Sequence, residues 1–132
     1  MRQLADPGFL LSMANTVHTV ILENDAMSQM QLEYFCSNIP EITLLKNFDN
    51  SEEAISYLKA TQPDLLFLDI ELNDGQGWQV LDHLTPATQV VVTTSHDGHI
   101  EKARTEYGIQ HVLKKPIRLN EFLHEMNGLV KR

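Results

Sequence analysis

The chain has 132 residues, a formal net charge of -8 and a single cysteine. This length suits one domain with its own hydrophobic core, and a lone cysteine excludes an intrachain disulfide. Direct nucleic-acid binding by this domain is not expected, because it requires clustered Lys and Arg. No run is long and apolar enough to span a membrane, so we expect a cytoplasmic protein whose acidic surface suits a basic or mixed protein partner, or a divalent cation.

Residues 1–16 precede any periodic pattern and are predicted to be an N-terminal extension, with the domain itself over residues 17–132. The extension contains one Arg, an early Asp6-Pro7-Gly8 turn and a short apolar patch, Phe9-Leu10-Leu11. This pattern is too weak for a signal peptide. We expect the extension either to fray or to lie against the domain through the apolar patch.

From residue 17 onward, β-branched apolar runs alternate with segments of helical periodicity. We predict strands over residues 17–22, 42–48, 65–69, 90–94 and 110–114. The first two predicted helices carry apolar positions at Met27, Met30, Leu32, Tyr34 and Phe35, and, after a cap at Asn50 or Ser51, at Ala54, Ile55 and Leu58. The third predicted helix is short and contains Trp78, Val80, Leu81 and Leu84. The fourth spans residues 97–107 and ends at Gly108, and the fifth spans residues 119–130.

The segment from Leu65 to Leu68 is the clearest of the predicted strands. Four consecutive apolar residues lie between the turn signals Pro63-Asp64 and residues 73–77, as in a parallel strand buried on both faces. Five alternations of strand and helix require right-handed crossovers and helices on both faces of the sheet. The predicted fold is a doubly wound α/β domain with a five-stranded parallel sheet.

Polar side chains follow four of the five predicted strands. The carboxyl ends of such strands meet at one edge of the sheet, and they carry Glu23-Asn24-Asp25, Asp69, Thr94-Ser95 and Lys115. Crowded carboxylates raise one another's pKa unless a cation lies among them, and oxygen ligands favour Mg²⁺. A Lys and a Thr opposite the metal would hold a tetrahedral anion. Taken singly, Asp69 as a loop cap and Lys115 as a solvated strand end remain alternatives.

From about residue 17 to residue 131, the chain resembles the receiver domain of two-component response regulators. The resemblance rests on the acidic cluster after the first strand, the segment 66–72 around Asp69, Gly77, Thr94-Ser95 and Lys115-Pro116, in this order. It implies a flavodoxin-like strand order 2-1-3-4-5 and phosphorylation by a sensor histidine kinase or phosphotransfer protein. It also implies an output domain or target protein as partner; a homodimer stays open. Two stretches look like receivers attached to LytTR-type DNA-binding domains.

The resemblance implies a role for each matching residue. Asp69 is similar to the phosphoacceptor aspartate, and Lys115 to the lysine that contacts the phosphoryl oxygens. Thr94 matches the hydroxyl residue that binds the new phosphate, and Ser95 the small residue beside it. Glu71 matches the position whose backbone carbonyl binds the metal, and we also place it among the phosphate-binding residues. The Lys115-Pro116 peptide bond is commonly cis in that family.

The chain departs from the family pattern at the metal site. Receivers usually place two or three acids after the first strand, and the second binds Mg²⁺ directly. Alignment of the apolar run puts Glu23 and Asn24 at these positions, and the uncharged Asn24 carbonyl oxygen predicts weaker Mg²⁺ binding. A register shifted by one residue would put Asp25 on the metal instead.

Other residues predict how a signal would leave the site. Val112 occupies the place where many receivers carry an aromatic rotamer switch, so coupling through residue 112 is not expected. Asn73 replaces the proline that is usual in the loop after the phosphoacceptor. The partner surface is predicted on the fourth helix, fifth strand and last helix. The six histidines are interpreted as surface imidazoles, with His96 alone near the active edge, and Trp78 and Cys36 as packing residues.

Three alternatives to a phosphorylated switch remain open. A pseudo-receiver would keep the fold and bind partners without phosphorylation, with Asn24 marking a lost metal site. A phosphatase with an aspartyl-phosphate intermediate would use Glu71 as general acid, but no further motif follows it. A flavodoxin-like cofactor binder would need a Ser/Thr/Gly phosphate loop after the first strand, and this chain has none there. We therefore favour a switch over an enzyme.

Overall fold

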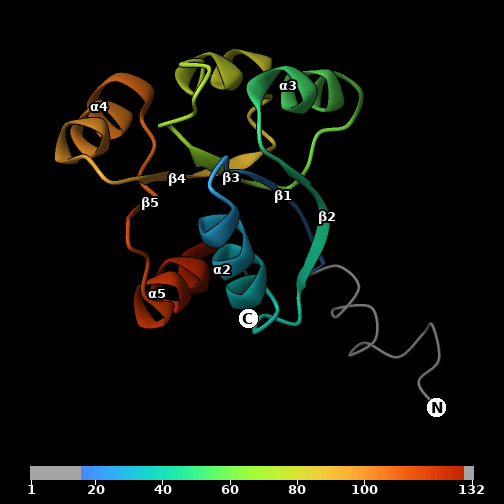
Figure 1. Ribbon diagram of the computed structural model, residues 1–132. Coiled ribbons are helices and arrows are strands. Elements are labelled where there is room, and N and C mark those ends of the chain that lie inside the picture. Colours follow the sequence, from blue (N-terminus) through green and yellow to red (C-terminus); the bar gives the residue numbers. More distant parts are fainter. Residues whose placement is uncertain (1–15, 130–132) are drawn as a thin grey trace.

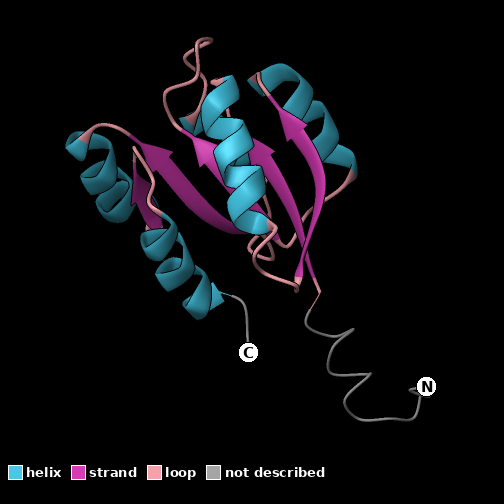
Figure 2. Cartoon of the chain, turned by 60° about the horizontal axis from the view of Figure 1, so that its bottom comes forward, coloured by secondary structure: helices cyan, strands magenta, loops and turns pink. Residues whose placement is uncertain are grey.

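The computed structural model describes residues 16–129. In this part of the chain five strands form one sheet in the order β2-β1-β3-β4-β5, which confirms the predicted fold. All neighbouring strands are parallel, and their arrows point the same way in Figure 2. The strands are β1 Val17–Leu22, β2 Ile42–Phe48, β3 Leu65–Asp69, β4 Gln89–Thr94 and β5 Val112–Lys114.

Helices cover both faces of the sheet (Figure 1). One face carries α2 Ala26–Cys36 and α5 Leu119–Leu129, and the other carries α3 Ser51–Ala60, the 3-10 helix η1 Trp78–His83 and α4 Asp97–Tyr107. None of the helices within residues 16–129 is long and apolar enough to cross a membrane.

Strand β3 lies at the centre because its side chains serve two cores. Leu66 and Leu68 belong to the cluster under α3, η1 and α4, whereas Leu65 and Phe67 belong to the cluster under α2 and α5. The Phe67 ring stacks on Phe122 of α5 at a centroid distance of 5.7 Å. All five residues of β3 are buried, as expected for a parallel strand covered on both faces.

Local signals set the start of α3. Asn50 is its N-cap, as predicted, and its side-chain oxygen accepts the Glu53 N–H at 2.9 Å. Asp74, from the loop after β3, accepts the Ser51 N–H at 2.9 Å and the Ser51 hydroxyl at 3.0 Å. Two carboxamide or carboxylate groups therefore satisfy the first turn of α3, and one of them ties it to the loop that follows Asp69.

The structure corrects several predicted details. The short helix after β3 is a 3-10 helix that ends at His83, and β5 begins only at Val112. The predicted helix over α2 is confirmed, but three of its apolar positions are not part of the core, because Met27, Met30 and Tyr34 are 80%, 67% and 64% exposed. A helix on a sheet buries one stripe, and in α2 this stripe consists of Leu32, Phe35 and Cys36.

The buried thiol is as predicted, and the pKa of Cys36 rises to about 12 because burial disfavours the thiolate and Glu33 lies near. The apolar patch at Phe9-Leu10-Leu11 and the predicted helix position Val130 lie outside the described residues.

Candidate functional site

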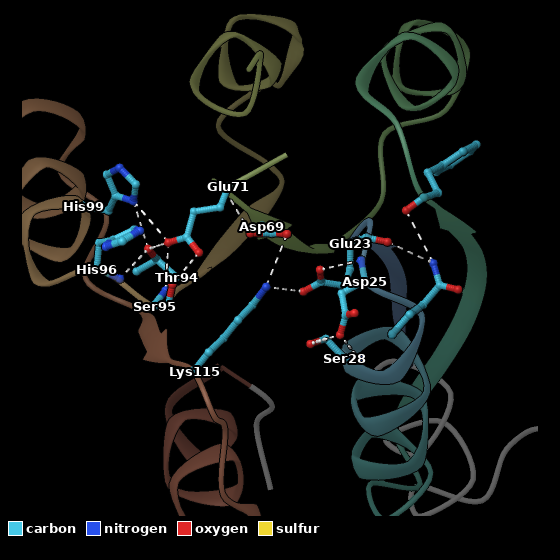
Figure 3. Close-up of polar contacts among 12 residues, drawn as sticks. Glu23, Asp25, Ser28, Asp69, Glu71, Thr94, Ser95, His96, His99 and Lys115 are labelled. Carbon is cyan, nitrogen blue, oxygen red and sulfur yellow. Dashed lines mark hydrogen bonds and ion pairs between the residues drawn. The ribbon is translucent and has the colours of Figure 1, made fainter. Parts of the chain in front are cut away.

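The carboxyl ends of four strands bring the predicted site residues to one edge of the sheet (Figure 3). Asp69 ends β3, Thr94 ends β4, Glu23 follows β1 directly, and Lys115 follows β5 directly. The Lys115 N–H donates to the Thr94 carbonyl at 2.7 Å, which fixes the lysine backbone beside β4. Parallel topology is therefore sufficient to gather these side chains.

Glu23, Asp69 and Lys115 form a buried group that we call the acid–lysine cluster. The Lys115 ammonium lies 2.7 Å from a Glu23 carboxylate oxygen and 3.3 Å from Asp69 Oδ2. Both acidic residues are 1% exposed, and the Lys115 side chain is 18% exposed. Two carboxylates thus share one ammonium in a place that water barely reaches.

Burial and the shortage of positive charge both affect the pKa values. Burial, followed by the hydrogen bond and charge of Asp69, raises the pKa of Glu23 from 4.5 to about 7, against the bonds from Lys115 and the Asp25 N–H. Burial alone would lower the pKa of Lys115, but its bonds and charge interactions with Glu23 and Asp69 outweigh burial and raise it. An additional cation would stabilise both carboxylates in their ionised form.

The oxygen donors of the cluster fit a hard divalent cation with several retained waters. Mg²⁺ is usually bound through one or two carboxylates plus waters, and Glu23 and Asp69 supply two. No group of three or more His, Cys, Asp or Glu side chains within residues 16–129 is arranged to hold a metal ion. The further ligands predicted from the sequence are the Asn24 amide and the Glu71 backbone carbonyl, with Asp25 as the alternative.

Asp25 has a different task in this structure. It is the N-cap of α2, and its Oδ2 accepts both the N–H and the hydroxyl of Ser28, at 2.9 and 2.8 Å. These bonds hold the pKa of Asp25 below its ordinary value. The Asp25 N–H donates to Glu23 Oε2 at 3.0 Å, so the carboxylate turned into the cluster is that of Glu23. Which residues bind a metal stays a prediction.

A second group surrounds the Glu71 carboxylate, and we call it the Glu71 clamp: Glu71, Thr94, Ser95 and His99. The Thr94 hydroxyl donates to Glu71, and Ser95 donates its N–H at 2.8 Å and its hydroxyl at 2.7 Å. His99 Nδ1 lies 3.3 Å from the same carboxylate. The Glu71 N–H donates to Asp69 Oδ1 at 2.9 Å, so the backbone of Glu71 joins the clamp to the acid–lysine cluster.

The clamp has more donors than carboxylates. Burial on its own would raise the pKa of Glu71, but the hydrogen bonds from Thr94, Ser95 and His99 outweigh it and lower the pKa to about 2. Glu71 is therefore a carboxylate anion at neutral pH. Its side chain would repel a phosphate, and the predicted phosphate contact of Glu71 is compatible only with its backbone.

His99 is the site residue that sequence reasoning missed, and the interpretation of His96 as the one histidine near the active edge was wrong. His99 Nδ1 lies 2.9 Å from Thr94 Oγ1, whereas His96 reaches Thr94 through its backbone N–H at 3.1 Å. Position 99 lies in the first turn of α4, directly after the strand end that carries Thr94. That placement is the signal that could have identified it.

The histidines are also less uniform than surface imidazoles. The side chains of His99 and His111 are 32% and 31% exposed, and His111 Nδ1 lies 2.9 Å from Glu125. His18 is half exposed and contacts Asp64 at 3.2 Å. A neighbouring carboxylate, rather than solvent alone, positions each of these rings.

Aromatic residues connect the clamp with α4. The Trp78 ring stacks on Tyr107 at a centroid distance of 4.8 Å and meets the His99 ring edge-on at 6.0 Å. The Lys102 ammonium lies 5.1 Å from the Trp78 ring centroid. Trp78 is therefore a packing residue, as predicted, while Val112 is buried and the Lys115-Pro116 peptide bond is cis.

Gly77 holds the loop after Asp69 against the sheet. A Cβ atom at this position would lie 2.6 Å from the Ile70 carbonyl oxygen and 2.9 Å from the Ile70 Cα. Because both atoms are backbone, no side-chain movement would relieve the contact. Glycine at position 77 thus permits the close approach of this loop to the Ile70 backbone, one residue before Glu71.

Comparison with known proteins agrees with this fold. A family model described as the response regulator receiver domain matches residues 19–127. The sensory transduction protein LytT of Enterococcus faecalis is 32% identical over 101 residues, which cover 74% of this chain and 42% of that protein. The chain thus spans less than half the length of this curated relative.

Solved structures share the same architecture. The response regulatory domain of protein mrkE from Klebsiella pneumoniae superposes with a TM-score of 0.77 at 18% identity, covering 85% of this chain and 93% of that one. A chain from the complex of the CheA3 P1 domain with CheY6 of R. sphaeroides gives 0.73 at 24% identity, with 88% and 98% covered. The chain belongs to the receiver-domain family of two-component response regulators, and its LytT relative agrees with the resemblance to LytTR-associated receivers.

Proposed function

We propose that this receiver is a phosphorylation-dependent switch in which Asp69 accepts a phosphoryl group from a phosphohistidine of a sensor kinase or phosphotransfer protein. The observation that carries the proposal is the 3.3 Å approach of the Lys115 ammonium to Asp69 Oδ2 at the end of the central strand, beside a second buried acid, Glu23. Phosphoryl transfer to an aspartate requires a nucleophile and a cation for the phosphoryl oxygens. Asp69 and Lys115 supply these two groups, and the carboxylate pair of Asp69 and Glu23 would be stabilised by a second cation.

In the proposed transfer, an Asp69 carboxylate oxygen attacks the phosphorus of the donor phosphoimidazole. The new O–P bond forms as the P–N bond breaks, and the electron pair stays on the imidazole nitrogen, which takes up a proton from water. Lys115 offsets charge on the phosphoryl oxygens, and its raised pKa keeps it protonated for this purpose. The product is an aspartyl phosphate.

A magnesium ion is part of the same proposal. Glu23 and Asp69 would hold it through their carboxylates, together with the Glu71 backbone carbonyl and the Asn24 amide oxygen. When bound, the ion would neutralise negative charge on the carboxylates and on the transferred group. Asn24 contributes no charge, so weak Mg²⁺ affinity is expected.

The output belongs to the proposal as well. Phosphorylation adds negative charge where Thr94 and Ser95 can donate hydrogen bonds, which would rearrange the start of α4. The face formed by α4, β5 and α5 would then bind an output domain, a target protein or a second copy of the chain. The solved complex of the CheA3 P1 domain with CheY6 supports a domain of the P1 type as the docking partner in this transfer. We infer a non-enzymatic, cytoplasmic switch.

A pseudo-receiver that binds partners without phosphorylation is the second candidate, and specific observations favour it. Asp69 is 1% exposed, and the donors of Thr94 and Ser95 are already occupied by Glu71. Asn24 lacks the charge expected at the metal site. In this case the surface would be active in its resting conformation.

Incubation with Mg²⁺ and acetyl phosphate or a phosphohistidine donor separates the two candidates. We expect intact-mass spectrometry to show the addition of one phosphoryl group to the wild type and to Asp82→Asn, a control at an exposed position. Asp69→Asn should show none. If the wild type gains no phosphoryl group and does not respond to beryllofluoride at saturating Mg²⁺, the pseudo-receiver is the correct function.

A further inference from the structure

The Glu71 clamp presents a conflict that the proposed function does not resolve. Under the proposed function, a phosphoryl group on Asp69 would accept hydrogen bonds from Thr94 and Ser95, and in this structure the donors of both residues point to the Glu71 carboxylate (Figure 3). Glu71 is two residues from Asp69, and its own N–H donates to Asp69 Oδ1 at 2.9 Å. One anion, supplied by the chain itself, already occupies the donors that a second anion would use.

On the basis of the proposed function, we propose that the Glu71 side chain is a latch that competes with the aspartyl phosphate for Thr94 and Ser95. Its release is transmitted through His99, in the first turn of α4, and through Trp78 to the last residue of that helix, Tyr107. The latch keeps the resting conformation until a phosphoryl group displaces it. Glu71 and His99 are positioning residues in this scheme, since neither forms a bond to phosphorus.

Electrostatics makes the competition mutually exclusive. The Glu71 carboxylate accepts hydrogen bonds from Thr94 and Ser95, and a phosphoryl group on Asp69 would bring further negative charge to the same donors. Two anions cannot share the same few donors without repulsion. The carboxylate must therefore move out toward solvent, and its side chain, 24% exposed in this conformation, has a route to do so.

His99 is the residue that connects the latch with α4 and Trp78. Its Nδ1 lies 2.9 Å from Thr94 Oγ1 and 3.3 Å from the Glu71 carboxylate, so departure of Glu71 and movement of Thr94 remove the partners that orient the ring. The same ring meets the edge of Trp78, which stacks on Tyr107 at the end of α4. A change at the clamp thereby reaches α4 by direct contact, although Val112 provides no aromatic switch.

The test compares beryllofluoride affinity in saturating Mg²⁺ for the wild type, Glu71→Ala and the control Glu52→Ala, which removes an exposed carboxylate from α3. Fluorine NMR follows binding. We expect Glu71→Ala to bind about tenfold more tightly than the wild type, within the usual range of coupling between two competing states, and Glu52→Ala to match the wild type. Binding by Glu71→Ala alone would equally support the latch.

Two results distinguish failure of the latch from failure of the proposed function. Equal affinity of wild type, Glu71→Ala and Glu52→Ala would overturn the latch and leave phosphoacceptor function intact. No binding by any of the three proteins would refute the proposed function and the latch together. Loss of protection of the Ser95 amide against hydrogen exchange in free Glu71→Ala provides an independent check that the carboxylate was its acceptor.

The transmission step has its own measurement, because Trp78 is the one tryptophan of the chain. Saturating beryllofluoride is expected to change Trp78 fluorescence in the wild type and in His124→Ala, a control at an exposed histidine of α5. His99→Ala should lose most of this change at saturation, where a difference in affinity has no effect. The full wild-type change in His99→Ala would show that His99 transmits nothing.

Discussion

Glu23 and Glu71 lie at the same edge of the sheet and differ in almost every other respect (Figure 3). Glu23 is buried beside a second carboxylate, with one ammonium between them, and its pKa rises to about 7. Glu71 is less buried, receives hydrogen bonds from three residues, and its pKa falls to about 2. The balance of donors and carboxylates, together with burial, sets the charge of each group.

This difference assigns a separate task to each region. The acid–lysine cluster is short of positive charge, so it favours a cation or a reaction that brings one. The Glu71 clamp has a surplus of donors that an anion of the chain already occupies. Under the proposed function, the receiver would bind its cation in one region and change conformation in the other, and the backbone of Glu71 lies between the two regions.

Removing Lys115 should have the largest effect on stability, because it leaves two buried carboxylates without a partner. We expect Lys115→Ala to lose about 3–5 kcal/mol of unfolding free energy in metal-free urea titrations, as is typical when one partner of a buried ion pair is deleted. Added Mg²⁺ should restore part of the loss.

The neighbouring residue provides the control. Lys114 pairs with Asp97 at 2.8 Å, but both side chains are largely exposed, so Lys114→Ala should lose less than about 1 kcal/mol. Similar losses for the two variants would show that the buried ammonium of Lys115 contributes no more to stability than the exposed ammonium of Lys114.

A methyl group at Gly77 should disturb the junction between the two regions. Gly77→Ala places a Cβ against the Ile70 backbone, and we expect a loss of about 1–3 kcal/mol, the usual range for overpacking a buried position. Gly98→Ala meets no atom within 4 Å and lies in α4, so its stability should stay equal or rise slightly. A tolerated Gly77→Ala would mean that the loop does not depend on this close approach.

The two glutamates should give opposite pH dependences in metal-free buffer. The folded-state pKa of Glu23 is raised, so the folded protein binds the extra proton and Glu23 lowers stability as the pH rises from 4.5 through about 7. Relative to wild type, Glu23→Gln should therefore gain at least about 1 kcal/mol between pH 5 and pH 8, the value of one pKa unit. Glu71 acts in the opposite direction, and its contribution is lost as the pH falls from 4.5 toward about 2.

Urea unfolding at a series of pH values measures how the unfolding free energy of each protein depends on pH. The difference between wild type and variant removes the contribution of the titratable groups that both proteins contain. Parallel stability curves for wild type and Glu23→Gln would show that burial beside Asp69 does not perturb Glu23 in the folded state.

The sequence by itself determined the fold and the gathering of Asp69, Thr94 and Lys115. Alternating periodicity requires a parallel sheet, and a parallel sheet brings the carboxyl ends of its strands to one edge, whatever the side chains are. Local pattern also placed a helix cap at Asn50 or Ser51, of which the structure selects Asn50, and it predicted the buried Cys36.

Only the tertiary structure decided how the side chains at that edge are paired. The contacts of Glu71 with Thr94 and His99 join residues 23 and 28 positions apart, and they depend on loop conformation and rotamers that no periodicity encodes. Likewise, the tertiary structure decides which acid after β1 turns inward. Glu23 enters the cluster and pairs with Lys115, whereas Asp25 caps α2 through Ser28. Topology places residues at an edge, and close packing across that edge selects their partners.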